Sequence, residues 1–178
     1  MEKFKTKYRV KSARLQSWNY GWNAAYFVTI CIADKVCHFG DVQDGEMQLS
    51  AIGLWAEKCW LEIPDHFPFV LLDSFVVMPN HVHGIIIIDK PVETQNVETQ
   101  NIASLQNKFG PQSQNLASVV RGYKIGVTKR AKPLHINFVW QPRFHEHIIR
   151  NQETYLKISE YIQDNPRKWQ EDKYYASI

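Results

Sequence analysis

The spacing of apolar residues divides the chain into segments typical of strands and helices. Runs rich in β-branched and aromatic residues predict four strands, over residues 24–33, 69–77, 81–88 and 138–144. Apolar residues at helical spacing predict three helices, over residues 51–62, 115–131 and 152–164. Ser50 and Asn151 are suited to cap the first and third helices, and each helix is followed by a proline: Pro64, Pro133 and Pro166.

The order of these elements predicts the fold class. Strand, helix, strand, strand, helix and strand match the split βαβ, ferredoxin-like pattern. We therefore expect one α+β domain over residues 1–178, with a four- to five-stranded antiparallel sheet, helices mainly on one side and an extra C-terminal helix. Residues 34–49 predict a loop or small hairpin. The polar residues 91–113, which contain a tandem Val-Glu-Thr-Gln-Asn repeat, predict a flexible insertion loop.

Composition excludes a membrane protein and indicates a polyanionic partner. No apolar run is long enough to span a bilayer and no signal peptide is evident, so we expect a cytoplasmic protein. The formal net charge is +3, but residues 1–14 hold six basic side chains against one acidic, and residues 121–132 contain basic residues and no acidic one. Charge separated in this way favours nucleic acid, although a solvated tail or helix face would look the same.

Two histidines lie in the third apolar strand. Side chains alternate along a strand, so His81 and His83 share one face and Val82 points to the other. The turn over residues 78–80 places the pair at the start of this strand, near the sheet's edge, while apolar residues on both faces of residues 81–88 predict a central, covered strand. A single histidine in an apolar run is usually structural. Two at strand spacing suit a metal or phosphate site, because a buried pair of imidazoles needs partners.

Tyr161 and Asn165 lie four residues apart and share one face of the third predicted helix. If that face meets the two imidazoles, the site gains a phenol and an amide oxygen. A hard cation such as Mg²⁺ or Mn²⁺ would use its remaining positions for water and phosphate oxygens. The pattern also allows a core role for Tyr161, since an apolar stripe on the same helix is formed by Tyr155, Ile158 and Ile162.

Residues 77–83, 140–151 and 160–166 resemble the single-tyrosine HUH transposases of the IS200-like superfamily. The pieces Trp-Gln-Pro-Arg-Phe and Tyr-Ile-x-x-Asn-Pro are similar to the REP-associated tyrosine transposases. The resemblance implies a metal-dependent endonuclease and strand-transferase that cuts single-stranded DNA through a 5′-phosphotyrosine intermediate. It implies that His81, His83 and Asn165 hold Mg²⁺ or Mn²⁺. It also implies that Tyr161 is the nucleophile.

The same resemblance implies DNA contacts for the basic residues. Relatives bind a DNA hairpin beside the cleavage site, so we expect single-stranded DNA with REP-like hairpins as the partner. The expected DNA-binding residues are Lys3, Lys5, Lys7, Arg9, Lys11, Arg14, Arg121, Lys124, Lys129, Arg130 and Arg143. Relatives include dimers and monomers, and both states stay open. The alternative function is a nucleic-acid-binding module on the same fold without chemistry, which metal-dependent cleavage would separate from an enzyme.

Tyr123 and a second pair of histidines are further candidates for a functional role. Tyr123 lies beside basic residues but belongs to an apolar helical stripe, which predicts a place in the core. His145 and His147 form a second His-x-His. We interpret them as supporting the junction between the last strand and the third helix, or as binding phosphate.

Overall fold

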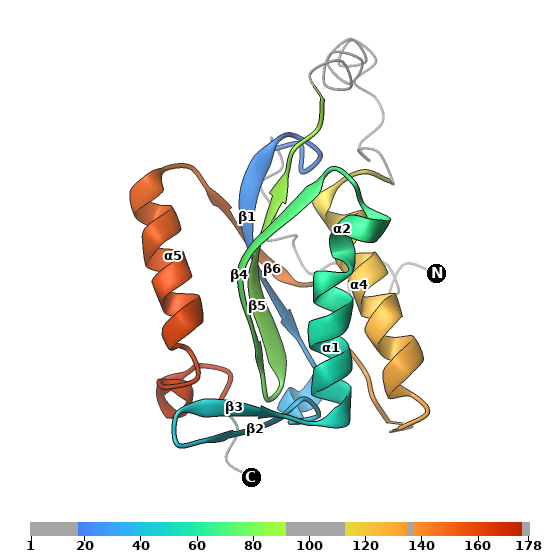
Figure 1. The fold of residues 1–178 in the computed structure, drawn as a ribbon, viewed down its shortest axis with the longest axis vertical. Helices are drawn as coiled ribbons and strands as arrows, with labels where there is room; N and C mark the ends of the chain where they lie inside the picture. Colours follow the sequence, from blue (N-terminus) through green and yellow to red (C-terminus); the bar gives the residue numbers. More distant parts are fainter. Residues whose placement is uncertain (1–17, 92–112, 135–136, 176–178) are drawn as a thin grey trace, which may run out of the picture.

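The computed structural model describes residues 18–91, 113–134 and 137–175 (Figure 1). Its strands and helices, in chain order, are β1 (Ala24–Cys31), η1 (Ala33–Lys35), β2 (Gly40–Gln43), β3 (Glu46–Leu49), α1 (Ala51–Leu61), α2 (Ile63–His66), β4 (Val70–Met78), β5 (His81–Ile88), α4 (Leu116–Ala131), β6 (His145–Ile149), α5 (Gln152–Asp164) and η3 (Trp169–Glu171). The predicted N-terminal arm and most of the predicted insertion loop lie outside the described residues.

One antiparallel sheet has the strand order β4-β5-β1-β6. Helices α1 and α4 cover one face and α5 covers the other (Figure 1). This is the predicted split βαβ sandwich with an extra C-terminal helix, and β2 with β3 forms the predicted small hairpin. No helix in the described residues combines the length and apolar character that crossing a membrane needs.

The first and last of the three long helices begin at the capping residues that the sequence predicts. The Ser50 hydroxyl accepts from the backbone N–H of Gly53, and Asn151 caps α5 through the N–H of Thr154 in the same way. Asn115 is the N-cap of α4, and its capping box satisfies two backbone groups. Local hydrogen bonding therefore fixes the start of α5, the helix that carries Tyr161.

The last strand does not lie where the apolar pattern predicted it. Residues 138–144 contribute only an isolated bridge between Ile32 and Trp140, and the strand is β6, over His145–Ile149. Pro142 has no N–H to donate to a ladder, and Arg143 has a φ of 68°, which takes the backbone out of the extended region. The apolar residues there fill the core instead: Phe138 is 2% exposed.

Strand β5 lies between β4 and β1, and the expectation that the histidine pair sits near the sheet's edge is wrong. The pair starts a central strand instead, as the apolar residues on both faces indicated. Met78 pairs with His81, so Pro79 and Asn80 alone make the turn between β4 and β5. This hairpin holds the imidazoles at one end of the sheet.

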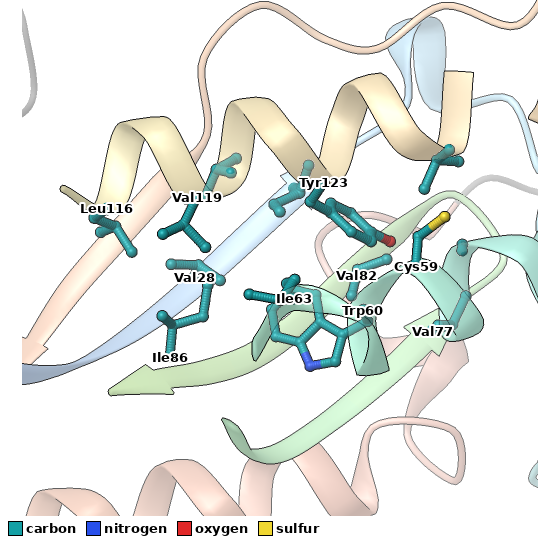
Figure 2. Packing of buried hydrophobic residues seen from close by; sticks show 14 of the residues in the cluster. Val28, Cys59, Trp60, Ile63, Val77, Val82, Ile86, Leu116, Val119 and Tyr123 are labelled. Atoms are coloured by element: carbon teal, nitrogen blue, oxygen red, sulfur yellow. The ribbon is translucent and has the colours of Figure 1, made fainter. Parts of the chain in front are cut away.

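Beneath the histidine pair, the opposite face of β5 packs in the main hydrophobic core. Val82 and Ile86 lie under α1 and α4, beside Trp60 and Tyr123 (Figure 2). Tyr123 is 3% exposed, which confirms its predicted core position. Gly84 lies between these apolar residues because the Trp60 ring occupies the space a side chain would need: a Cβ at Gly84 would lie 2.3 Å from Trp60 Cζ2.

Gly84→Ala is therefore expected to destabilise the fold by about 1–3 kcal/mol, since either β5 or the buried indole must shift. Urea unfolding measures the change in the free energy of unfolding. Gly126→Ala on α4 is the control, because its Cβ would lie 3.4 Å from Cys59 Sγ, with no backbone strain. Removing a helical glycine there should add about 0.5–1 kcal/mol of stability. Equal stability of the Gly84→Ala variant and the parent would contradict this account of the packing.

Candidate active site

His81 and His83 lie on the face of β5 that meets α5. Both side chains are buried, and their ring centroids are 4.4 Å apart. Val82 between them points into the core on the other face. Strand alternation therefore produces the predicted pair of imidazoles on one face.

The hydrogen bonds of Asn80 fix the tautomer of His81. The Asn80 amide nitrogen donates to the backbone carbonyls of Lys35 (3.1 Å) and Tyr174 (2.9 Å), which turns its amide oxygen toward His81. That oxygen can only accept, so His81 Nδ1, 2.9 Å away, carries the ring proton. Nε2 of His81 keeps its lone pair, is buried, and has no hydrogen-bond partner among the described residues. This is the state that a metal-binding histidine requires.

His83 is held between Thr29 and Tyr161. Its Nδ1 lies 2.9 Å from the Thr29 hydroxyl, and its Nε2 lies 3.2 Å from the Tyr161 hydroxyl. Phe27 stacks on the ring with a centroid distance of 5.3 Å. Because a threonine hydroxyl can donate or accept, His83 can carry its proton on Nδ1 and present Nε2 as a ligand without changing its charge.

Tyr161 and Asn165 meet the imidazole pair from the C-terminal end of α5. The Tyr161 hydroxyl also donates to Asp172 Oδ2 at 3.1 Å. Asn165 is buried, its amide nitrogen donates to the same Asp172 oxygen at 3.1 Å, and its Oδ1 has no partner among the described residues. The convergence predicted for the strand and the helix therefore occurs, and all of these groups come from one chain.

Asp172 is the residue of this site that the sequence did not indicate. It follows η3 and caps that short helix. One ligand atom each from His81, His83 and Asp172 lie within 4.8 Å of one another. An aspartate seven residues beyond Asn165 has no periodic relation to the histidines, so no spacing signal could have found it.

Burial sets the protonation states. Desolvation lowers the pKa of His81 to about 3 and that of His83 well below its ordinary value, so both rings are neutral at neutral pH. Desolvation, together with the neighbouring Asp172 carboxylate, raises the pKa of Tyr161 to about 12. The phenol therefore keeps its proton until a positive charge or a base draws it off.

The donor set fits a divalent cation. His81 Nε2 and Asn165 Oδ1 are buried polar atoms that lack hydrogen bonds within the described part of the chain, and each such atom costs free energy unless it finds a partner. The Asp172 carboxylate supplies the negative charge that two neutral imidazoles and an amide lack. Mixed nitrogen and oxygen ligands of this kind suit Mn²⁺, and Mg²⁺ when phosphate oxygens complete the set.

The basic residues of α4 do not reach this site. Residues 1–14, with their expected DNA contacts, lie outside the described residues. Helix α4 lies on the face of the sheet opposite α5 (Figure 1), and Arg121 and Lys129 are exposed there. Lys124 instead donates to the backbone carbonyls of residues 141 and 143, at 2.8 and 2.6 Å, and its partial burial lowers its pKa to about 8. Arg130 lies 4.2 Å from the Trp55 ring centroid.

The second His-x-His belongs to β6 rather than to the junction after it. His145 pairs with Thr29 and His147 pairs with Phe27, so both side chains share the face of the sheet that carries His83. Both side chains are exposed, and neither makes a hydrogen bond or ion pair within residues 18–91, 113–134 and 137–175.

The α+β fold of this chain is also found in a solved tyrosine transposase. A solved REP-associated tyrosine transposase bound to a REP hairpin shares the fold, with a TM-score of 0.59 and 19% identity, over 90% of this chain and 74% of that one. An uncharacterized protein of Haemophilus influenzae is 44% identical over 168 residues, 93% of each chain. The present chain belongs to the family of that protein. No protein-family model matches the chain.

Proposed function

We propose that this protein is a metal-dependent endonuclease and strand-transferase that acts on single-stranded DNA beside hairpins. The observation that carries the proposal is the position of the Tyr161 hydroxyl, 3.2 Å from His83 Nε2 and 3.1 Å from Asp172 Oδ2. The shared fold with a transposase solved on a REP hairpin supports the choice of substrate.

The proposed reaction is a transesterification at one phosphodiester. The Tyr161 oxygen forms a bond to phosphorus while the bond from phosphorus to the 3′ oxygen breaks, which leaves a 5′-phosphotyrosine and a free 3′ hydroxyl. The nearest base for the phenol proton is Asp172, which already accepts it in a hydrogen bond. The departing 3′ oxygen takes a proton from water. Rejoining reverses these bonds with the 3′ hydroxyl of another strand.

The residues that would hold Mg²⁺ or Mn²⁺ are His81, His83, Asn165 and Asp172. When bound, the cation would polarise the scissile phosphate and stabilise charge on the leaving oxygen. The protein's own contribution is positional: Asn80 and Thr29 fix the two rings, and Asn165 ties Asp172 to the end of α5. Asp172 Oδ2 accepts from Tyr161 and Asn165, and Oδ1 accepts from the backbone N–H of Tyr174. A carboxylate has about four lone-pair sites, so Asp172 can still serve as ligand and as proton acceptor.

Incubation of the protein with single-stranded hairpin DNA from the flanks of its own gene tests the proposal. We expect a protein–DNA adduct that survives denaturing electrophoresis, that forms with Mn²⁺ and that is absent with EDTA. The 5′-labelled fragment should be released with a 3′ hydroxyl, while the downstream fragment stays on the protein. Tight DNA binding without any metal-dependent adduct would refute the enzyme and leave a binding module on the same fold.

A further inference from the structure

A cavity of about 310 Å³, with both polar and apolar lining, lies beside the imidazole pair and plays no part in the proposed chemistry. It opens at the end of the sheet where β1 and β6 meet. The side chains that matter for its chemistry are Cys31, Lys35, Gln141, His145, Lys173 and Tyr174.

The cavity shares a wall with the candidate active site. The Tyr174 ring lies 4.7 Å from the His81 ring and 5.9 Å from the His83 ring, measured between centroids, and it also lines the cavity. Cys31, which also lines the cavity, is the strand partner of His81. A group in the cavity would therefore sit one aromatic ring away from the imidazole pair.

Strand register gives the distance to the reacting groups. His83 and His145 are the two cross-strand neighbours of Thr29, one on each side, and share its face. Two strand spacings separate them by about 10 Å. The cavity therefore lies close enough to Tyr161 for the same short stretch of DNA to occupy both.

The lining suits a nucleotide. Lys35, Lys173 and His145 supply basic groups, and no carboxylate is among the lining residues in the part of the chain that the structure describes. Lys35 is held in place because its ammonium donates to the backbone carbonyls of residues 173 and 175, at 2.9 and 3.5 Å. The Gln141 amide and the His145 imidazole offer both donors and acceptors, which is what the edge of a base requires. Cations beside amides and an aromatic ring are typical of single-strand sites.

The size of the cavity decides between a duplex and a single strand. A volume of about 310 Å³ is at the lower end of small-ligand sites, which suits one base. A hairpin stem, whose major groove alone is about 12 Å wide, does not fit.

We propose that this cavity receives one unpaired nucleotide next to the scissile phosphate. His145 and Gln141 contact its base, and Lys35 and Lys173 contact the adjoining phosphates. The inference rests on the proposed function, since it places the strand that Tyr161 would cut. It assigns to His145 a role in substrate binding. His147, two residues further along β6 on the same face, is not among the residues that line the cavity.

A double variant, His145→Ala with Gln141→Ala, tests the assignment. Both side chains are exposed, so the fold should be retained, which circular dichroism checks. We expect fluorescence anisotropy to show about tenfold weaker binding of a labelled 12-nucleotide oligothymidine, because one base contact is worth about 1–3 kcal/mol. On a cleavable hairpin substrate, the KM should rise by a similar factor while kcat stays within about twofold.

The matched control is His66→Ala with Gln152→Ala, which removes the same side-chain types from exposed positions outside the cavity and should leave affinity unchanged. Unchanged oligothymidine binding by the His145 and Gln141 variant, while the parent still forms its adduct, would overturn this inference and leave the proposed function standing. Weaker binding by that variant, with no adduct from the parent, would support the nucleotide site and refute the enzyme.

Discussion

Tyr161→Phe is expected to reduce the covalent DNA adduct at least about a thousandfold while DNA affinity changes by less than about threefold. The variant removes one oxygen atom from a side chain that is 40% exposed, so the fold should hardly change. That oxygen is the atom that contacts both His83 and Asp172. Electrophoresis under denaturing conditions measures the adduct, and anisotropy measures binding in the absence of metal.

Two other tyrosines make this prediction specific. Tyr155 on the same helix donates to Asp73, so Tyr155→Phe is the control and should form adduct at the parental rate. Tyr174 also packs against the imidazole pair, with its ring centroid 4.7 Å from that of His81, but it bonds Asp172 through its backbone N–H, 2.7 Å from Oδ1. If mass spectrometry of the adduct located the DNA on Tyr174, or if Tyr161→Phe retained the adduct, the assignment of the nucleophile would be wrong.

The histidine pair could be predicted from the sequence because its cause is local. Alternation along a strand places His81 and His83 on one face regardless of the rest of the fold, and helical periodicity does the same for Tyr161 and Asn165. The fold class followed from the order of such elements. Residue spacing and the resemblance gave only a hypothesis that the histidine face of the strand would meet the Tyr161 face of the helix. No local rule says which elements pack together.

The errors fall where long-range packing overrides a local pattern. Residues 138–144 have the apolar content of a strand, yet the backbone at Pro142 and Arg143 cannot continue a ladder, and Phe138 is drawn into the core. The strand that forms instead begins at His145, among polar residues on an edge, where hydrophobic content is a weak signal. Asp172 has no periodic signal, and only the turn of the chain after α5 brings it to the imidazoles.

Asp172→Asn is expected to weaken Mn²⁺ binding by at least about a hundredfold. Replacing an outer partner of a metal ligand typically costs about 10- to 100-fold in affinity, and a charged ligand should cost at least as much. The substitution keeps the shape of the side chain, but an amide has one acceptor oxygen where the carboxylate has two. Oδ2 now accepts from Tyr161 and Asn165 and Oδ1 accepts from the backbone N–H of Tyr174, so the variant loses the negative charge and the hydrogen bonding of one of these oxygens. Isothermal titration calorimetry of the metal-free protein with MnCl₂ gives the dissociation constants without any catalytic readout.

The neighbouring substitution Glu171→Gln is the matched control, because it removes one carboxylate from an exposed position that is outside the group formed by His81, His83 and Asp172. It should bind Mn²⁺ as the parent does. Thermal unfolding gives a second measurement: a saturating metal should raise the Tm of the parent and of Glu171→Gln, and should raise that of Asp172→Asn much less.

Equal Mn²⁺ affinity in Asp172→Asn and the parent would reduce the ligand set to His81, His83 and Asn165, the set that the sequence resemblance implies. Asp172 would then act only on the phenol of Tyr161, and the variant would lose adduct formation while keeping its metal. We expect Asp172→Asn to lose adduct formation and metal binding together. The Asp172 carboxylate accepts from Tyr161 and Asn165, and the same carboxylate has a ligand atom within 4.8 Å of those of His81 and His83. Proton acceptance and metal binding would then depend on one side chain, so any change that moves Asp172 away from α5 would remove both.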